Sequence, residues 1–174
     1  LVIPGSGLIR AGIAIRRGKI SSVALENALP PAKEELDASG LHVFPGIFDP
    51  HVHLGFSGSF ANDCRTESLS ALAAGTTTLS ALLREPGSYL DLFSDFRNDA
   101  EANSYTDMLF SLKIGEELQV EEIPAYVNKL GVTGFKCYQY GLPGIVEAED
   151  DGIIYMAMKT ISRLGSPTFL AIHC

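Results

Sequence analysis

Two patterns of hydrophobic and polar residues divide the chain near residue 46. Residues 8–44 alternate apolar and polar positions over short runs, and residues 12–15 and 20–23 flank the sequence Arg16-Arg17-Gly18-Lys19. Short alternating runs joined by a glycine-containing turn are typical of a β-hairpin. From Ile47 onward, strand-like apolar runs alternate with helix-like stretches. The pattern therefore predicts a partial β-sandwich domain in residues 1–45 and an α/β domain in residues 46–174.

The second domain is expected to contain five strands and four helices. The predicted strands are residues 47–51, 76–83, 107–114, 132–138 and 168–173, and the predicted helices lie near residues 65–74, 90–102, 120–130 and 152–164. Strands that alternate with helices form parallel sheets with right-handed crossovers. This order predicts an α/β fold, and it fits either a small open sheet or just over half of a (β/α)8 barrel.

Composition and charge exclude some classes of function. The chain is 46% hydrophobic and 20% charged, as expected of a folded domain with a core. Its 13 Lys and Arg against 21 Asp and Glu argue against nucleic-acid binding and against attachment to an anionic membrane. Three widely spaced cysteines indicate reduced thiols in a cytoplasmic protein. Because the chain starts without Met and stops within an apolar run, we expect a fragment of a longer protein.

The strongest chemical signal is the pair His51 and His53. Side chains of a strand alternate with period two, so these imidazoles are expected on one face at the end of the first barrel strand. Imidazole is the commonest metal ligand near neutral pH. Asp49 has the same parity, and we expect it one step deeper on that face, as a residue that supports the site.

Two further residues strengthen the prediction of a metal site. Lys136 lies near the end of the fourth predicted strand and His173 ends the fifth. Functional groups of a (β/α)8 barrel gather at these strand ends. Each residue alone has an ordinary structural explanation, and Lys113 at the end of the third strand competes with Lys136. Their joint placement favours the metal site.

The motif Pro45-Gly46-x-x-Asp49-x-His51-x-His53 resembles the opening signature of the amidohydrolase superfamily, specifically its cyclic-amidase branch of dihydropyrimidinase, hydantoinase, allantoinase and dihydroorotase. Residues 75–78, 131–136 and 171–173 are similar to further segments of that family. The resemblance covers almost the whole chain. It implies the N-terminal half of a TIM (β/α)8 barrel, with about five strands, preceded by part of a small β-sandwich.

The resemblance also implies a site with two divalent metal ions, typically Zn²⁺. His51 and His53 would bind the first ion, His173 the second, and Lys136, carboxylated by carbon dioxide, would bridge both. A carbamate supplies anionic oxygens where an ammonium would repel the ions. A hydroxide bridging the ions would open the C–N bond of a cyclic amide. The family places another histidine and an aspartate beyond residue 174, so we expect this piece alone to be inactive.

The substrate expected from the resemblance is a small cyclic amide. His53 is followed by Leu54-Gly55-Phe56, which offers no cation for a carboxylate, and this favours a dihydropyrimidine, a hydantoin or a related ureide. The family has a tyrosine five residues beyond the bridging lysine, where this chain has Gly141. Tyr140 is the candidate for its catalytic role as hydrogen-bond donor to the oxyanion; a tyrosine packed on the barrel rim is the alternative. The family further implies a homotetramer.

Three alternatives stay open at this point. The first is an allantoinase or a dihydroorotase-type cyclic amidase. The second is a non-catalytic scaffold related to dihydropyrimidinase, although every ligand expected within this span is present. The third is a dipeptidase-like or deaminase-like amidohydrolase that lacks the lysine bridge.

Overall fold

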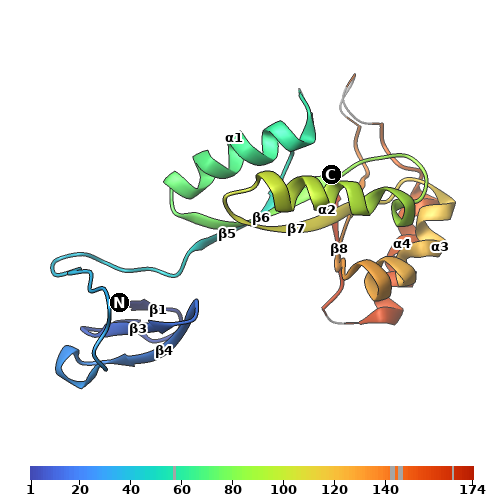
Figure 1. Ribbon diagram of the computed structural model, residues 1–174. Coiled ribbons are helices and arrows are strands. Elements are labelled where there is room, and N and C mark those ends of the chain that lie inside the picture. Colours follow the sequence, from blue (N-terminus) through green and yellow to red (C-terminus); the bar gives the residue numbers. More distant parts are fainter. Residues whose placement is uncertain (57, 142–143, 145–146, 166) are drawn as a thin grey trace. The chain divides into compact units, whose positions relative to one another are not determined.

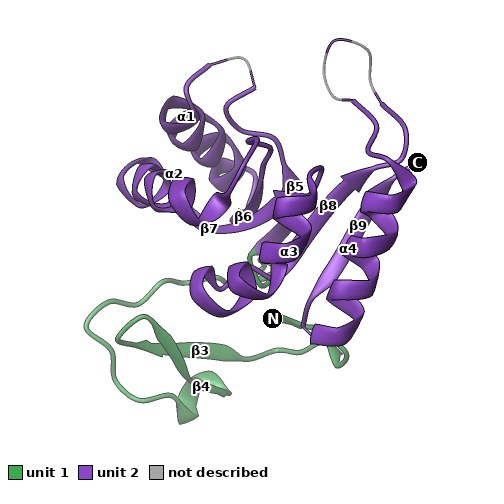
Figure 2. Ribbon diagram, turned by 90° about the vertical axis from the view of Figure 1, so that its right-hand side faces the viewer, with its two compact units in different colours: residues 1–46 green, residues 47–174 purple. Residues whose placement is uncertain are grey.

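Two units of the chain, Leu1–Gly46 and Ile47–Cys174, form separate sets of contacts in the computed structural model (Figure 2). The structure describes residues 1–56, 58–141, 144, 147–165 and 167–174. Within these ranges, no helix is both long enough and apolar enough to cross a membrane. Each unit is built from a different kind of sheet.

The first unit consists of two small antiparallel ladders. β1 (Val2–Ile3) pairs with β2 (Gly7–Leu8), and β3 (Gly12–Arg16) pairs with β4 (Lys19–Ala24) before a short 3-10 turn at Glu26–Ala28. Arg17 and Gly18 connect β3 to β4 with φ angles of 53° and 72°. Two central residues with positive φ are required by the tight turn that matches the twist of a hairpin. The predicted hairpin is therefore confirmed.

The second unit contains one parallel sheet of five strands in the order β5-β6-β7-β8-β9. The strands are β5 (Ile47–Val52), β6 (Thr76–Leu83), β7 (Asp107–Lys113), β8 (Gly134–Tyr138) and β9 (Phe169–His173). Each strand lies beside the one before it, without the reversal of order that a doubly wound sheet shows. The sheet is curled, as in part of a (β/α)8 barrel, and this decides between the two predicted architectures.

Four helical segments connect the strands. They are α1 (Phe60–Ala73), α2 (Tyr89–Asn103), α3 (Glu117–Ala125) with the π-turn η2 (Tyr126–Leu130), and α4 (Asp151–Leu164). α1 begins five residues earlier than predicted, because Ser59 caps it by accepting a hydrogen bond from the Asn62 N–H. The helix predicted over 120–130 changes to a π-turn just after Pro124, which lacks an N–H for the regular ladder.

The helices cover one face of the sheet (Figure 1). Right-handed crossovers between successive neighbouring strands place every helix on the same side. Strand residues such as Leu112, Phe135 and Cys137 are fully buried against this layer and belong to one apolar core. The opposite face carries Ser80 and Ser111, whose hydroxyl oxygens are 3.1 Å apart, and the side chain of Lys136. The inner face of the curled sheet thus carries polar side chains together with exposed apolar ones such as Leu109 and Phe169.

Candidate metal centre

His51 and His53 point their ring nitrogens at one another. Their Nε2 atoms are 3.1 Å apart and their rings are nearly perpendicular, at 85°. Two nitrogens that bind one zinc ion at about 2.0–2.1 Å with tetrahedral geometry are separated by about 3.3 Å. The observed separation therefore fits two ligands of a single ion. Within the described ranges, no cluster of three or more His, Cys, Asp and Glu side chains forms a complete site.

The expectation that Asp49 shares a face with the histidines by simple alternation is wrong, because β5 contains a register shift. Asp49 pairs with Leu79 and Val52 pairs with Ala81, so three steps along β5 match two steps along β6. An extra residue of this kind interrupts the alternation of side chains. The Asp49 carboxylate instead accepts a hydrogen bond of 3.1 Å from the backbone N–H of His51. Asp49 thus holds the irregular turn of backbone that presents His51.

Lys136 and His173 lie on adjacent strands with Tyr138 between them. In the register of β8 and β9, Tyr138 pairs with His173 and Lys136 pairs with Ala171. The Tyr138 and His173 rings are 5.4 Å apart, and Lys136 Nζ is 5.1 Å from the centre of the Tyr138 ring. Only 9% of Lys136 is exposed, and it forms no ion pair with a described residue. A lysine so buried and unpaired is unusual for a purely structural position.

Electrostatic interactions link these residues to the histidine pair. Burial lowers the pKa of His51, and the charges of Lys136 and His173 lower it further, while Asp49 opposes them. Burial also lowers the pKa of His53, with contributions from His51, Arg84 and Lys136. A lowered pKa keeps each imidazole neutral near pH 7, which is its metal-binding form. The charges of Lys136 and His173 thus act in the same direction as burial at His51, and that of Lys136 does so at His53.

Arg84, which was not among the predicted site residues, lies at the end of β6 with its charge acting on His53. It directly follows β6, and its guanidinium carbon lies 3.5 Å from the centre of the Phe56 ring. Burial lowers the pKa of His53 and the charge of Arg84 adds to this, whereas burial raises the pKa of Tyr138 and the charge of Arg84 opposes it. The available signal was the position of Arg84 at a strand end, where groups from different strands converge.

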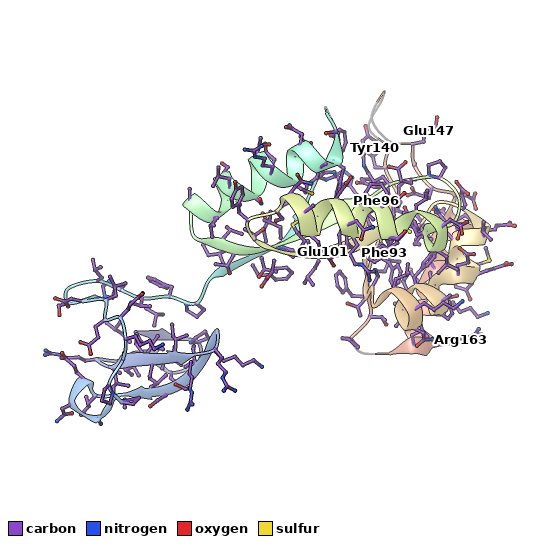
Figure 3. The ribbon with its side chains drawn as sticks, in the orientation of Figure 1. Phe93, Phe96, Glu101, Tyr140, Glu147 and Arg163 are labelled. Atoms are coloured by element: carbon purple, nitrogen blue, oxygen red, sulfur yellow. The ribbon has the colours of Figure 1, made fainter. Side chains whose placement is uncertain are left out.

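Tyr140 lies just beyond the carboxyl end of β8 (Figure 3). Its backbone N–H donates a hydrogen bond of 3.3 Å to the carbonyl of His173, whereas its side chain is 62% exposed. Tyr138 is 3% exposed and contacts the predicted ligands directly. The structure therefore places Tyr140 at the mouth of the site and Tyr138 inside it.

Comparisons with known proteins relate the chain to one group of enzymes. No family model matches it. An allantoinase of Solibacter usitatus is 34% identical over 99% of this chain and 37% of its own length. A D-hydantoinase of Geobacillus stearothermophilus is 30% identical over 95% of this chain and 36% of its own length. A crystal structure of a D-hydantoinase matches with a TM-score of 0.80 and 29% identity, over 94% of this chain and 36% of that one.

The matches extend over nearly the whole chain in both sequence and fold. The chain nevertheless spans only 36–37% of the length of these relatives. Its five-stranded sheet corresponds to part of their barrel, which confirms the predicted half-barrel architecture. The predicted resemblance is also confirmed: over nearly its whole length this chain is similar to allantoinases and hydantoinases, which is consistent with the cyclic amidohydrolase branch.

Proposed function

We propose that the whole protein is a metal-dependent hydrolase that opens the C–N bond of a cyclic amide. The observation that supports the proposal is the convergence of the His51 and His53 ring nitrogens in a chain similar to allantoinases and D-hydantoinases, with Lys136 and His173 at the carboxyl ends of β8 and β9 in the same sheet. The preferred substrates are a hydantoin or a dihydropyrimidine, as for the D-hydantoinases among its relatives.

The residues present fit a pair of divalent cations, which we propose to be zinc. His51 and His53 would hold one ion and His173 the other, and Lys136 in its carboxylated form would contact both. The separation of the two histidine nitrogens and the absence of an ion pair at Lys136 within the described ranges support this arrangement. When bound, the cations would lower the pKa of water and polarise the amide carbonyl.

The chain's own residues would orient the reacting groups. Asp49 fixes the backbone of His51 and thereby its ring. Tyr140, at the mouth, would donate its hydroxyl proton as a hydrogen bond to the oxygen of the attacked carbonyl. Tyr138 lies close to both Lys136 and His173, where its buried ring would restrict the entry of water. We further propose that the protein is a cytoplasmic homotetramer, in agreement with its free cysteines and its family.

The test is a substrate panel on the full-length protein. We expect hydrolysis of hydantoin and dihydrouracil that stops on chelation and returns when Zn²⁺ is added back. Hydrolysis that survives complete removal of metal would contradict the proposal. The same assay on Lys136→Ala separates the lysine-bridged class from amidohydrolases without that bridge, because only the former should lose its second ion.

A second class of substrate is favoured by Arg84. Its guanidinium lies against Phe56 and close enough to His53 to lower the pKa of that residue, and it forms no ion pair with a described residue. An unpaired guanidinium beside a reaction centre is suited to a carboxylate, which it binds with two parallel hydrogen bonds. Arg84→Lys should then lower kcat/KM for dihydroorotate about tenfold more than for dihydrouracil. Equal effects on the two substrates would exclude this class.

A further inference from the structure

We propose that Glu149 is a positioning residue that engages Lys113 in an ion pair and so leaves Lys136 as the lysine available for carboxylation. The inference rests on the proposed function, because it concerns the choice between two lysines for the bridging position. Both lysines stand at or near the carboxyl ends of neighbouring strands. The structure distinguishes them by their partners.

The two lysines are neighbours on the sheet. Lys113 of β7 pairs in register with Lys136 of β8, so their side chains leave the same face of adjacent strands. Lys113 Nζ lies 2.7 Å from Oε1 of Glu149, whereas Lys136 has no ion-pair partner within the described ranges. One amine is therefore engaged by a carboxylate and the adjacent one is not.

Glu149 depends on this contact. Its side chain is 2% exposed, and Oε1 has no aligned hydrogen-bond donor among the described residues, although the Lys113 ammonium lies close to it. The contact is thus mainly Coulombic. A buried carboxylate oxygen without a compensating charge is strongly unfavourable, so the pair resists separation. The Lys113 ammonium is therefore kept in its ion pair with Glu149.

The other end of Glu149 fixes the strand that carries Lys136. The Tyr138 N–H donates a hydrogen bond to Oε2 of Glu149, and the Glu149 N–H donates one of 2.8 Å to the carbonyl of Tyr138. The residue is therefore attached to β8 two positions beyond Lys136. The Glu149 carboxylate therefore binds the amine of Lys113 and also fixes the end of β8, the strand that carries Lys136.

The modification joins Nζ of Lys136 to the carbon of carbon dioxide. One C=O bond of carbon dioxide becomes C–O⁻, and the nitrogen releases a proton to water, which gives an anionic carbamate. Nζ of Lys113 would have to leave the Glu149 carboxylate before it could form the same bond. Removal of that carboxylate should therefore make Lys113 a competitor.

The experiment measures acetylation of individual lysines by peptide mass spectrometry in the folded, metal-loaded, full-length protein. In Glu149→Gln we expect Lys113 to be acetylated about tenfold faster than in the wild-type protein, with both rates measured relative to that of exposed Lys33. The matched control is Glu147→Gln, two residues away on an exposed side chain (Figure 3), which should leave Lys113 unchanged. An unchanged rate for Lys113 in folded Glu149→Gln would overturn the proposal.

A second variant serves if Glu149→Gln does not fold. A Cβ at Gly115 would lie 2.7 Å from Lys113 Nζ, so Gly115→Ala must displace the amine while both charges are kept. It should raise acetylation of Lys113 in the same way, and an unchanged rate would again contradict the proposal.

The carbamate itself is followed by ¹³C NMR after exposure to ¹³CO₂. We expect one carbamate, on Lys136, in the wild-type protein, and a Lys136 share about twofold lower in Glu149→Gln, since the two amines then compete on equal terms. An unchanged share would count against the role of Glu149. Absence of any carbamate in the wild-type protein would overturn the proposed bridging lysine. The acetylation result would still report on the ion pair.

Discussion

The Nε2 atoms of His51 and His53 lie 3.1 Å apart although β5, which carries His51 and ends just before His53, contains a register shift. The shift falls between Asp49 and Val52, just before the second histidine, and the Asp49 carboxylate binds the N–H of His51 there. Bulges of this kind occur next to active sites because they redirect a side chain without ending the strand. The convergence of the two rings thus depends on a local irregularity.

Tyr140→Phe should lower kcat about 100-fold and leave KM almost unchanged, because the lost hydroxyl would stabilise charge that develops only in the transition state. Steady-state kinetics with hydantoin provide the measurement. Tyr138→Phe is the matched control, since this tyrosine is buried between Lys136 and His173. A large loss of kcat in Tyr138→Phe and none in Tyr140→Phe would transfer the role to Tyr138.

Tyr126→Phe should destabilise the α/β unit by about 1–3 kcal/mol. The Tyr126 hydroxyl donates a hydrogen bond of 2.7 Å to Glu122 and accepts one of 3.4 Å from the N–H of buried Tyr89. Its removal leaves the buried Tyr89 N–H without this partner, whereas Glu122 keeps the hydrogen bond that it accepts from the Ser88 hydroxyl. Urea unfolding of the full-length protein measures the change, and Tyr155→Phe, on a tyrosine that is 63% exposed, is the control. Equal stabilities of the two variants would contradict the prediction.

Cys64 and Cys137 should resist thiol reagents in the folded protein. Burial raises the pKa of each thiol from 9.0 to about 12, so the reactive thiolate is scarce at pH 8. Because the folded pKa lies above the unfolded one, the resulting stability is complete below pH 9 and is lost as the pH rises toward 12. Labelling followed by peptide mass spectrometry, with exposed Cys174 as the reference, measures the rates. Rapid labelling of either buried thiol at pH 8 would refute the assignment.

The 174-residue chain produced alone should self-associate. β5 and β9 form the two edges of its sheet, and Phe48, Leu109 and Phe169 are each 50% exposed or more. Unpaired strand edges and exposed apolar side chains favour association. Sedimentation velocity over a range of concentrations provides the measurement, and Leu109→Glu should reduce association more than Leu72→Glu on α1. A monodisperse monomer at all concentrations would show that the sheet needs no covering.

Much of the fold could be predicted from the sequence because its signals are local. Apolar runs located all five strands of the sheet, and the Arg17-Gly18 turn marked the hairpin. The register shift at Asp49 could not be predicted, because alternation assumes a regular strand and the bulge depends on pairing with β6. The π-turn after Pro124 likewise depends on how the helix end packs.

The residues of the candidate site also fall into two groups, those that local sequence signals identified and those that only the fold brings together. His51, His53, Lys136 and His173 were identifiable because their residue types are rare at the ends of apolar strands. The contact of Arg84 with Phe56 and the ion pair of Lys113 with Glu149 were not, because each joins segments more than twenty residues apart in the chain. Only the fold brings such partners together.

Metal analysis of the full-length protein, purified without added metal, tests the central claim most directly. We predict about two divalent ions per subunit, falling to about one or none in His51→Asn and in Lys136→Ala, with hydrolysis of hydantoin lost in parallel. A wild-type protein that contains no divalent ion and still hydrolyses hydantoin would contradict the account.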